Sequence, residues 1–217
     1  MHLDSQRGEV YELSDKSLKR LAFIANNTDV EFRSMVTLTY PGEFPLDGAL
    51  CKKHLRAILT AFKRRLGESV AYLWFLEFQR RGAPHFHVLI NVALTVEDHA
   101  WQQSWLSDRW YKIVGSGDPN HLLAGTRWEN IREIEGARHY MVKYAAKTYQ
   151  KEVPDGFTNV GRFWGTTRNI TCFPVLMEAV GLPEVRDRLG QWPFSEVLEE
   201  LAPRVLYNAA KWWNAGG

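Results

Sequence analysis

The chain has 217 residues, a length that allows one well-buried domain with an appendage. A content of 45% hydrophobic and 13% aromatic residues excludes an intrinsically disordered protein, and two cysteines exclude a disulfide framework or a zinc ribbon. The net charge of +2 does not by itself indicate a nucleic-acid partner. No apolar run reaches the roughly 18 residues of a membrane span, and the first ten residues do not resemble a leader, so we expect a cytoplasmic protein without membrane contact.

In the first half of the chain, the apolar spacing predicts two helices and three strands. Ser14 and Asp15 can cap a helix that runs through Leu18, Leu21 and Ile24. Residues 31–41 alternate as a strand does, and residues 50–66 have helical spacing that Gly67 closes. Residues 71–79 and 84–92 then form two strands joined by a short turn, which predicts a hairpin.

In the second half, Thr95 can cap a tryptophan-rich helix. We expect further elements over residues 126–134 (strand), 137–151 (helix) and 160–170 (strand), followed by acidic helices from residue 174. The order predicts an α+β fold: an antiparallel sheet of about five strands with helices packed on one face and the other face open for a substrate. The expected divisions are an N-terminal helical segment at 1–29, the main domain at 30–173 and a helical extension at 174–217.

Two histidines one residue apart, His85 and His87, lie in the second strand of the hairpin. They share one face of that strand and are separated by about 6–7 Å along it, which lets two imidazoles converge on one metal. Glu77 lies opposite His85 if the connecting loop has an odd number of residues; a shift by one residue would bring Gln79 there instead. One carboxylate and two imidazoles suit Mg²⁺ or Mn²⁺, although a polar surface pair remains the alternative interpretation.

A second pattern lies on the predicted helix at 137–151. Tyr140, Lys143, Tyr144 and Lys147 follow i, i+3, i+4, i+7 and therefore form one stripe, whereas Tyr149 falls on the apolar side. Phenols and ammonium groups on one face suit phosphate chemistry, with tyrosine as nucleophile and lysine stabilising the phenolate and phosphoryl charge. An ordinary solvated face is the alternative.

Together, the His85-Phe86-His87 strand and the later Tyr-x-x-Lys-Tyr-x-x-Lys pattern resemble the HUH endonucleases. More narrowly, the pattern resembles the rolling-circle replication initiators of bacterial plasmids and single-stranded DNA phages. The strand VTLTY at 36–40 looks like the first motif of that family, Glu77 occupies the slot of its third metal ligand, and GRFWGTTR at 161–168 resembles the tail of some members. The resemblance covers roughly residues 30–170.

The resemblance implies a metal-assisted nickase with a ferredoxin/RRM-like sheet. Glu77, His85 and His87 would hold Mg²⁺ or Mn²⁺ against the scissile phosphate of single-stranded origin DNA. Tyr140 would be the initiating nucleophile and Tyr144 the alternate, with Lys143 and Lys147 beside them, leaving a free 3′-OH and a 5′-phosphotyrosine. A host helicase and DNA polymerase would act with the protein, because the chain has no phosphate-binding loop of its own.

Four arginines are further candidates for DNA contacts: Arg80, Arg81, Arg162 and Arg168. Among the alternatives, a transposase or a relaxase would use the same chemistry, but relaxases place the tyrosine before the histidines. A histidine-triad hydrolase needs a third alternating histidine, where this chain has Leu89. A non-catalytic nucleic-acid-binding module would not need the histidines, Glu77 and the tyrosine stripe together.

Overall fold

The computed structural model describes residues 10–131 and 152–170. The strands are β1 (Ser34–Thr39), β2 (Tyr72–Phe78), β3 (Pro84–Ile90), β4 (Thr126–Asn130) and β5 (Trp164–Thr166). The helices are α1 (Asp15–Asn27), α2 (Gly48–Leu66), α3 (Val96–Val114) and α4 (Pro119–Ala124). The strands form one sheet in the order β4-β1-β3-β2-β5, and every pair of neighbours is antiparallel.

The sequence β1-α2-β2-β3-α3-β4 is a β-α-β-β-α-β unit of the ferredoxin-like kind, with β5 added at one edge. Local signals explain its helices. Asp47 accepts a hydrogen bond from the Ala49 amide at the start of α2, and Gly67 ends that helix at a φ of 97°. Thr95 accepts from the Asp98 amide at the start of α3. The predicted α+β class with a five-stranded antiparallel sheet is therefore confirmed.

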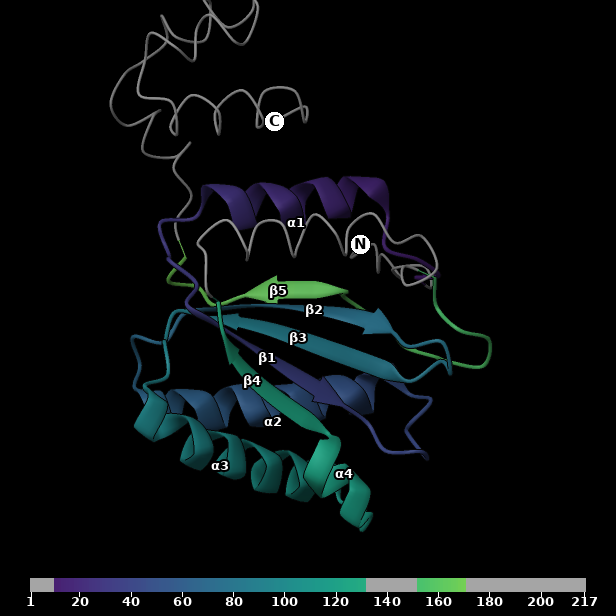
Figure 1. Ribbon diagram of the computed structural model, residues 1–217. Coiled ribbons are helices and arrows are strands. Elements are labelled where there is room, and N and C mark those ends of the chain that lie inside the picture. The colour runs from purple at the N-terminus through teal and green to yellow at the C-terminus, as the bar shows by residue number, and fades with distance from the viewer. Residues whose placement is uncertain (1–9, 132–151, 171–217) are drawn as a thin grey trace, which may run out of the picture.

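The main core lies between the sheet and helices α2 and α3, which cover the same face of the sheet (Figure 1). Leu55 and Ile58 of α2 and Leu106 and Trp110 of α3 are buried there with Phe86 and the other inward residues of the strands. Odd-numbered β3 residues are absent from this core because side chains alternate along a strand. His85 and His87 consequently belong to the opposite face.

Helix α1 departs from the expectation that all helices pack on one face. It lies across the opposite face of the sheet (Figure 1), where Leu21 and Ala25 pack with Met35, Leu73 and Leu89 in a second, smaller core. The physical reason is that these outward strand residues are themselves apolar, so this end of the second face needs a cover. The face that carries the histidines is therefore partly covered.

The element boundaries differ from the predicted ones mainly after residue 114. Helix α4 was not predicted, because its six residues are too few to show a periodic pattern. β4 and β5 are shorter than the predicted strands at 126–134 and 160–170. The expected helix at 137–151 and the expected extension at 174–217 lie outside the described residues. Within the described part of the chain, no helix is long and apolar enough to cross a membrane.

Candidate functional site

The β2–β3 hairpin brings the three proposed metal ligands to one face of the sheet. Glu77 pairs with His85, and Phe75 pairs with His87. The register is set by a loop between Phe78 and Pro84 in which Gln79 N donates to Ala83 O at 2.9 Å. Gly82 takes the positive φ of 81° that this turn requires. The register predicted for Glu77 and His85 is thus confirmed, and the one-residue shift is excluded.

His87 and Glu77 are in direct contact inside the protein. The distance between His87 Nε2 and Glu77 Oε2 is 3.2 Å, and the two residues are only 2% and 6% exposed. The Phe75 ring lies against the His87 ring with centroids 4.8 Å apart and planes at 20°. This stacking fixes the imidazole plane, so His87 presents its Nε2 to the carboxylate.

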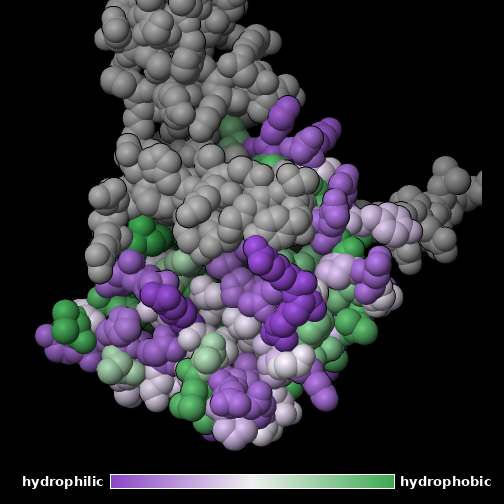
Figure 2. All heavy atoms as spheres, turned by 45° about the vertical axis from the view of Figure 1, so that its right-hand side comes forward, coloured by the Kyte–Doolittle hydropathy of each residue, from purple (hydrophilic) through white to green (hydrophobic). Residues whose placement is uncertain are grey.

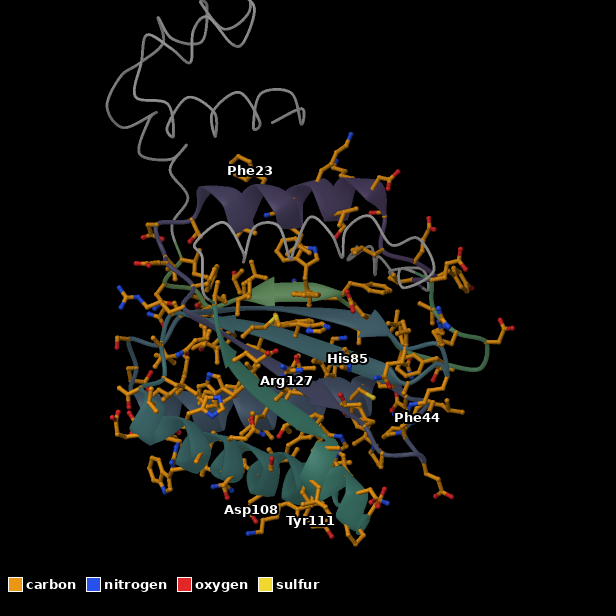
Figure 3. The ribbon with its side chains drawn as sticks, in the orientation of Figure 1. Phe23, Phe44, His85, Asp108, Tyr111 and Arg127 are labelled. Carbon is orange, nitrogen blue, oxygen red and sulfur yellow. The ribbon has the colours of Figure 1, made fainter. Side chains whose placement is uncertain are left out.

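His85 is the more accessible histidine, and it lies near the hairpin end of β3 (Figure 3). Its ring centroid is 4.5 Å from that of His87. When the molecule is turned so that the hairpin end comes forward, hydrophilic residues gather across the middle of the visible face, with smaller apolar patches toward its edges (Figure 2). A polar ligand can therefore approach the histidine pair from this end.

Two threonines of β1 lie beside the histidines. Thr39 Oγ1 is 3.0 Å from His85 Nδ1, and Thr37 Oγ1 is 3.4 Å from His87 Nδ1. The β1–β3 pairing places each threonine directly opposite its histidine. A hydroxyl that accepts from Nδ1–H orients the ring and leaves the lone pair on Nε2, as is usual for histidines that bind metals.

The backbone of Thr39 is held from the other side of the sheet. Its carbonyl oxygen accepts hydrogen bonds from Trp110 Nε1 at 2.8 Å and from His121 Nε2 at 2.9 Å. Its amide donates to Gly125 O at 2.8 Å. At Gly125 an added Cβ would clash with the His121 ring and its carbonyl oxygen, so only glycine fits. Helices α3 and α4 therefore position the hydroxyl that orients His85.

Burial lowers the pKa of His85 to about 3, with smaller contributions from the neighbouring His87 and Arg81. His85 is therefore neutral at pH 7. The neutral imidazole is the form that binds a divalent cation, so the pKa of this residue favours a ligand role without any competing proton.

The donor types present suit Mg²⁺ or Mn²⁺, but the side chains are not arranged around such an ion. Within residues 10–131 and 152–170, no group of three or more histidine, cysteine, aspartate or glutamate side chains is already gathered closely enough to hold a metal. Instead His87 Nε2 contacts Glu77. Metal binding would have to replace this contact, which needs a change of the Glu77 rotamer and no movement of the strands.

The four arginine candidates have different surroundings. Arg81 donates to the carbonyl oxygens of Tyr40 (2.6 Å), Pro41 (2.6 Å) and Gly42 (3.3 Å). Its guanidinium thus ties the hairpin turn to the end of β1, and a phosphate contact would have to compete with these bonds. Arg80, Arg162 and Arg168 are exposed and remain candidates for DNA contacts.

We expect Arg81→Ala to destabilise the fold, because it leaves several backbone carbonyls without their donor. The loss should be about 1–3 kcal/mol in the free energy of unfolding, measured by urea denaturation. Arg80→Ala is the matched control: its side chain is exposed at the same turn, and the change should stay within about 0.5 kcal/mol. Equal effects of the two substitutions would contradict the structural role of Arg81.

The predicted catalytic residues Tyr140, Lys143, Tyr144 and Lys147 all lie outside the described residues. Sequence reasoning did not identify Thr37 and Thr39 as neighbours of the histidines. The available signal was their alternation in VTLTY, which matches the alternation of His85 and His87. That signal becomes useful only once β1 is known to pair with β3.

Comparisons with known proteins agree with this arrangement. No curated protein and no solved structure matches the chain. A family model for replication-associated proteins of the ORF2 type matches residues 33–149, a region that begins just before β1 and includes the histidine hairpin. Because this match spans more than half of the chain, the protein belongs to the ORF2-type family of replication-associated proteins.

Proposed function

We propose that this protein initiates DNA replication by nicking single-stranded origin DNA. In the proposed reaction, the phenolate oxygen of Tyr140 attacks a backbone phosphorus, and the bond from phosphorus to the 3′ oxygen breaks. The 3′ oxygen leaves and takes up a proton, while the 5′ end stays attached to the tyrosine. The observation that carries the proposal is the pairing of His85 and His87 with Glu77 and two threonines on one sheet face, in a family of replication-associated proteins.

In this proposal His85, His87 and Glu77 would hold Mg²⁺ or Mn²⁺. When bound, such a cation would draw negative charge from a non-bridging phosphate oxygen. Thr39 and Thr37 keep the two imidazoles in the required tautomer and orientation. Lys143 stabilises the phenolate, whose free pKa is about 10, and Lys147 provides a second positive charge on the same predicted helix face.

The exchange of one phosphodiester for another keeps the energy of the broken bond, so the same site can run the reaction backwards. A free 3′-OH that attacks the phosphotyrosine restores a continuous strand and releases the phenol. The proposed initiator can therefore rejoin ends at termination. Strand separation and synthesis would fall to a helicase and a DNA polymerase of the host.

The test is covalent capture of single-stranded DNA by the purified full chain. A pool of about 40-nucleotide strands with a randomised centre is incubated with Mn²⁺ and separated on a denaturing protein gel. With a label at the 3′ end, the DNA should migrate with the protein, because the 3′ fragment carries the tyrosine-linked phosphate. With a label at the 5′ end, a shorter free strand should appear that a polymerase can extend.

The polarity and the metal dependence decide the outcome. Excess EDTA should remove both products. Adducts that persist in EDTA would contradict the metal-assisted reaction, and label transfer from the 5′ fragment would contradict the proposed polarity. If neither pool gives an adduct although the protein is folded, the proposed nicking activity is wrong. Sequencing the captured strands gives the preferred nick site.

Thr39 acts in this proposal as a positioning residue. Thr39→Val keeps the β-branched shape but removes the hydroxyl beside His85 Nδ1. We expect it to weaken Mn²⁺ affinity about 10- to 100-fold, as is typical when a partner of a metal ligand is lost, with a parallel loss of nicking. Isothermal titration calorimetry with Mn²⁺ measures the affinity directly. Thr39→Ser keeps the hydroxyl and should restore it; equal losses in both variants would show that the hydroxyl has no such role.

A further inference from the structure

An open groove of about 870 Å³ runs between α2 and α3. These helices pack on the face of the sheet opposite His85 and His87, and the Asp108 and Tyr111 side chains of α3 point away from the sheet (Figure 3). The basic residues that line the groove, called here the basic groove, are Lys53, Arg56, Arg64, Arg65 and Arg109. Within the described part of the chain, no carboxylate lines it.

Helical periodicity explains how the cations come together. Lys53, Arg56, Thr60 and Arg64 follow i, i+3, i+7, i+11 and form one stripe on α2, on a different side from the buried residues of that helix. The stripe is about 16 Å long, from 1.5 Å of rise per residue. This length corresponds to roughly five base pairs of B-form DNA. Arg109 stands on the α3 wall of the groove.

The positive charge of the basic groove is not neutralised locally. Among the residues that the structure describes, none of its five cations forms an ion pair. The nearby carboxylates have other partners: Asp108 pairs with Lys112 at 2.7 Å, and Glu68 pairs with Lys63 at 3.9 Å. A surface that gathers five cations without counter-charges attracts a polyanion.

The aromatic residues beside the groove are already engaged by Arg65. Its guanidinium carbon lies 3.8 Å from the ring centroid of Trp101 and 4.5 Å from that of Trp105, and its Nε donates to Gln102 Oε1 at 2.7 Å. Single-stranded nucleic acids are usually held by aromatic rings that stack on unpaired bases. The rings here support an arginine instead, so the site favours a phosphate backbone over free bases.

We propose that the basic groove binds the phosphate backbone of double-stranded DNA. Lysines and arginines that contact phosphates position a protein on DNA without reading its sequence. DNA is the polyanion of choice because the chain belongs to a family of replication-associated proteins. The surface does not depend on the nicking chemistry. It would hold duplex next to the origin while the histidine face engages the opened strand.

The test is the salt dependence of duplex binding by the full chain, measured in EDTA by fluorescence anisotropy with a labelled 20-base-pair duplex of arbitrary sequence. Each lost phosphate contact lowers the slope of log K against log salt by about 0.9. Arg56→Gln/Arg64→Gln should therefore reduce the slope by about 1.8. Between 50 and 200 mM salt, the unmodified protein should lose about twelvefold more affinity than the variant.

Three controls separate the possible causes. Arg56→Lys/Arg64→Lys keeps the charge and should keep the slope. Arg33→Gln/Lys112→Gln removes the same net charge from two cations that are already paired with Glu31 and Asp108, and it should change the slope little. Both groove arginines are exposed, so their replacement should leave the unfolding midpoint unchanged.

An unchanged duplex slope in the Arg56→Gln/Arg64→Gln variant would overturn the proposal, as would an equal loss in the Arg33→Gln/Lys112→Gln control. A reduced slope on a 20-nucleotide single strand with no effect on duplex would assign the groove to single strands and also overturn it. Nicking of a short single strand should be unaffected by the groove variant. Duplex binding should survive in a protein that does not nick, so the two proposals fail separately.

Discussion

His85→Ala and His87→Ala should each abolish metal-dependent nicking of single-stranded DNA. Both imidazoles lie on one face of β3 with ring centroids 4.5 Å apart, so the loss of either leaves too few donors to hold a divalent cation there. We expect no covalent adduct above background on a denaturing gel, a loss of at least roughly 100-fold, together with loss of Mn²⁺ binding in calorimetry.

The choice of control depends on burial. His87 is 2% exposed and packs on Phe75, so His87→Ala also removes core contacts, and its unfolding midpoint must be measured. His85 is more accessible and gives the cleaner variant. His99→Ala is the matched histidine control, because His99 is exposed and contacts only the Trp128 carbonyl in the described part of the chain. Nicking that survives in folded His85→Ala protein would refute the ligand role.

Glu77→Ala is expected to have a smaller effect than either histidine variant, about a 10- to 100-fold loss of Mn²⁺ affinity. Glu77 contacts His87 at 3.2 Å, so the carboxylate also orients that ring. Glu77→Gln separates the two roles, since the amide can still hydrogen bond to the imidazole but carries no charge. If Glu77→Gln binds Mn²⁺ as tightly as the unmodified protein, Glu77 is a positioning residue and the third ligand lies elsewhere.

Much of this half of the site follows from local sequence. Helix α2 and the β2–β3 hairpin were predicted because periodicity, a helix-closing glycine and a short turn are all local features. The odd-numbered loop then decided that Glu77 faces His85. Pairing between strands that are distant in sequence could not be predicted in this way. Thr39 meets His85 across 46 residues, and its backbone is held by Trp110 and His121.

The position of α1 illustrates the same limit. Its amphipathic pattern and the Ser14 cap predict a helix, but such a pattern identifies an apolar face and not its partner. The partner surface is formed by Met35, Leu73 and Leu89, one residue from each of three strands. Only the sheet order brings these residues together. The partly covered histidine face therefore had to come from the structure.

Tyr140→Phe should remove most of the covalent adduct formed on a short single strand, because phenylalanine has no oxygen to attack phosphorus. Tyr140 and Tyr144 lie one turn apart on the predicted helix, so both hydroxyls can reach one phosphate site. We assign initiation to Tyr140, three residues before Lys143, in line with the single-tyrosine members of the family that the pattern resembles. Tyr144→Phe should then keep the first cut but impair strand transfer.

The measurement is peptide mapping of the protein–DNA adduct by mass spectrometry, combined with a strand-transfer assay in which a second oligonucleotide supplies the 3′-OH. DNA found on Tyr140 with transfer lost in Tyr144→Phe supports the assignment. Tyr149→Phe is the matched control, because Tyr149 falls on the apolar side of the predicted helix and should keep full nicking and transfer. DNA on Tyr144 alone would reverse the order of the two tyrosines. DNA on Tyr149 would contradict the helical stripe, since no single helix face contains Tyr149 with both other tyrosines.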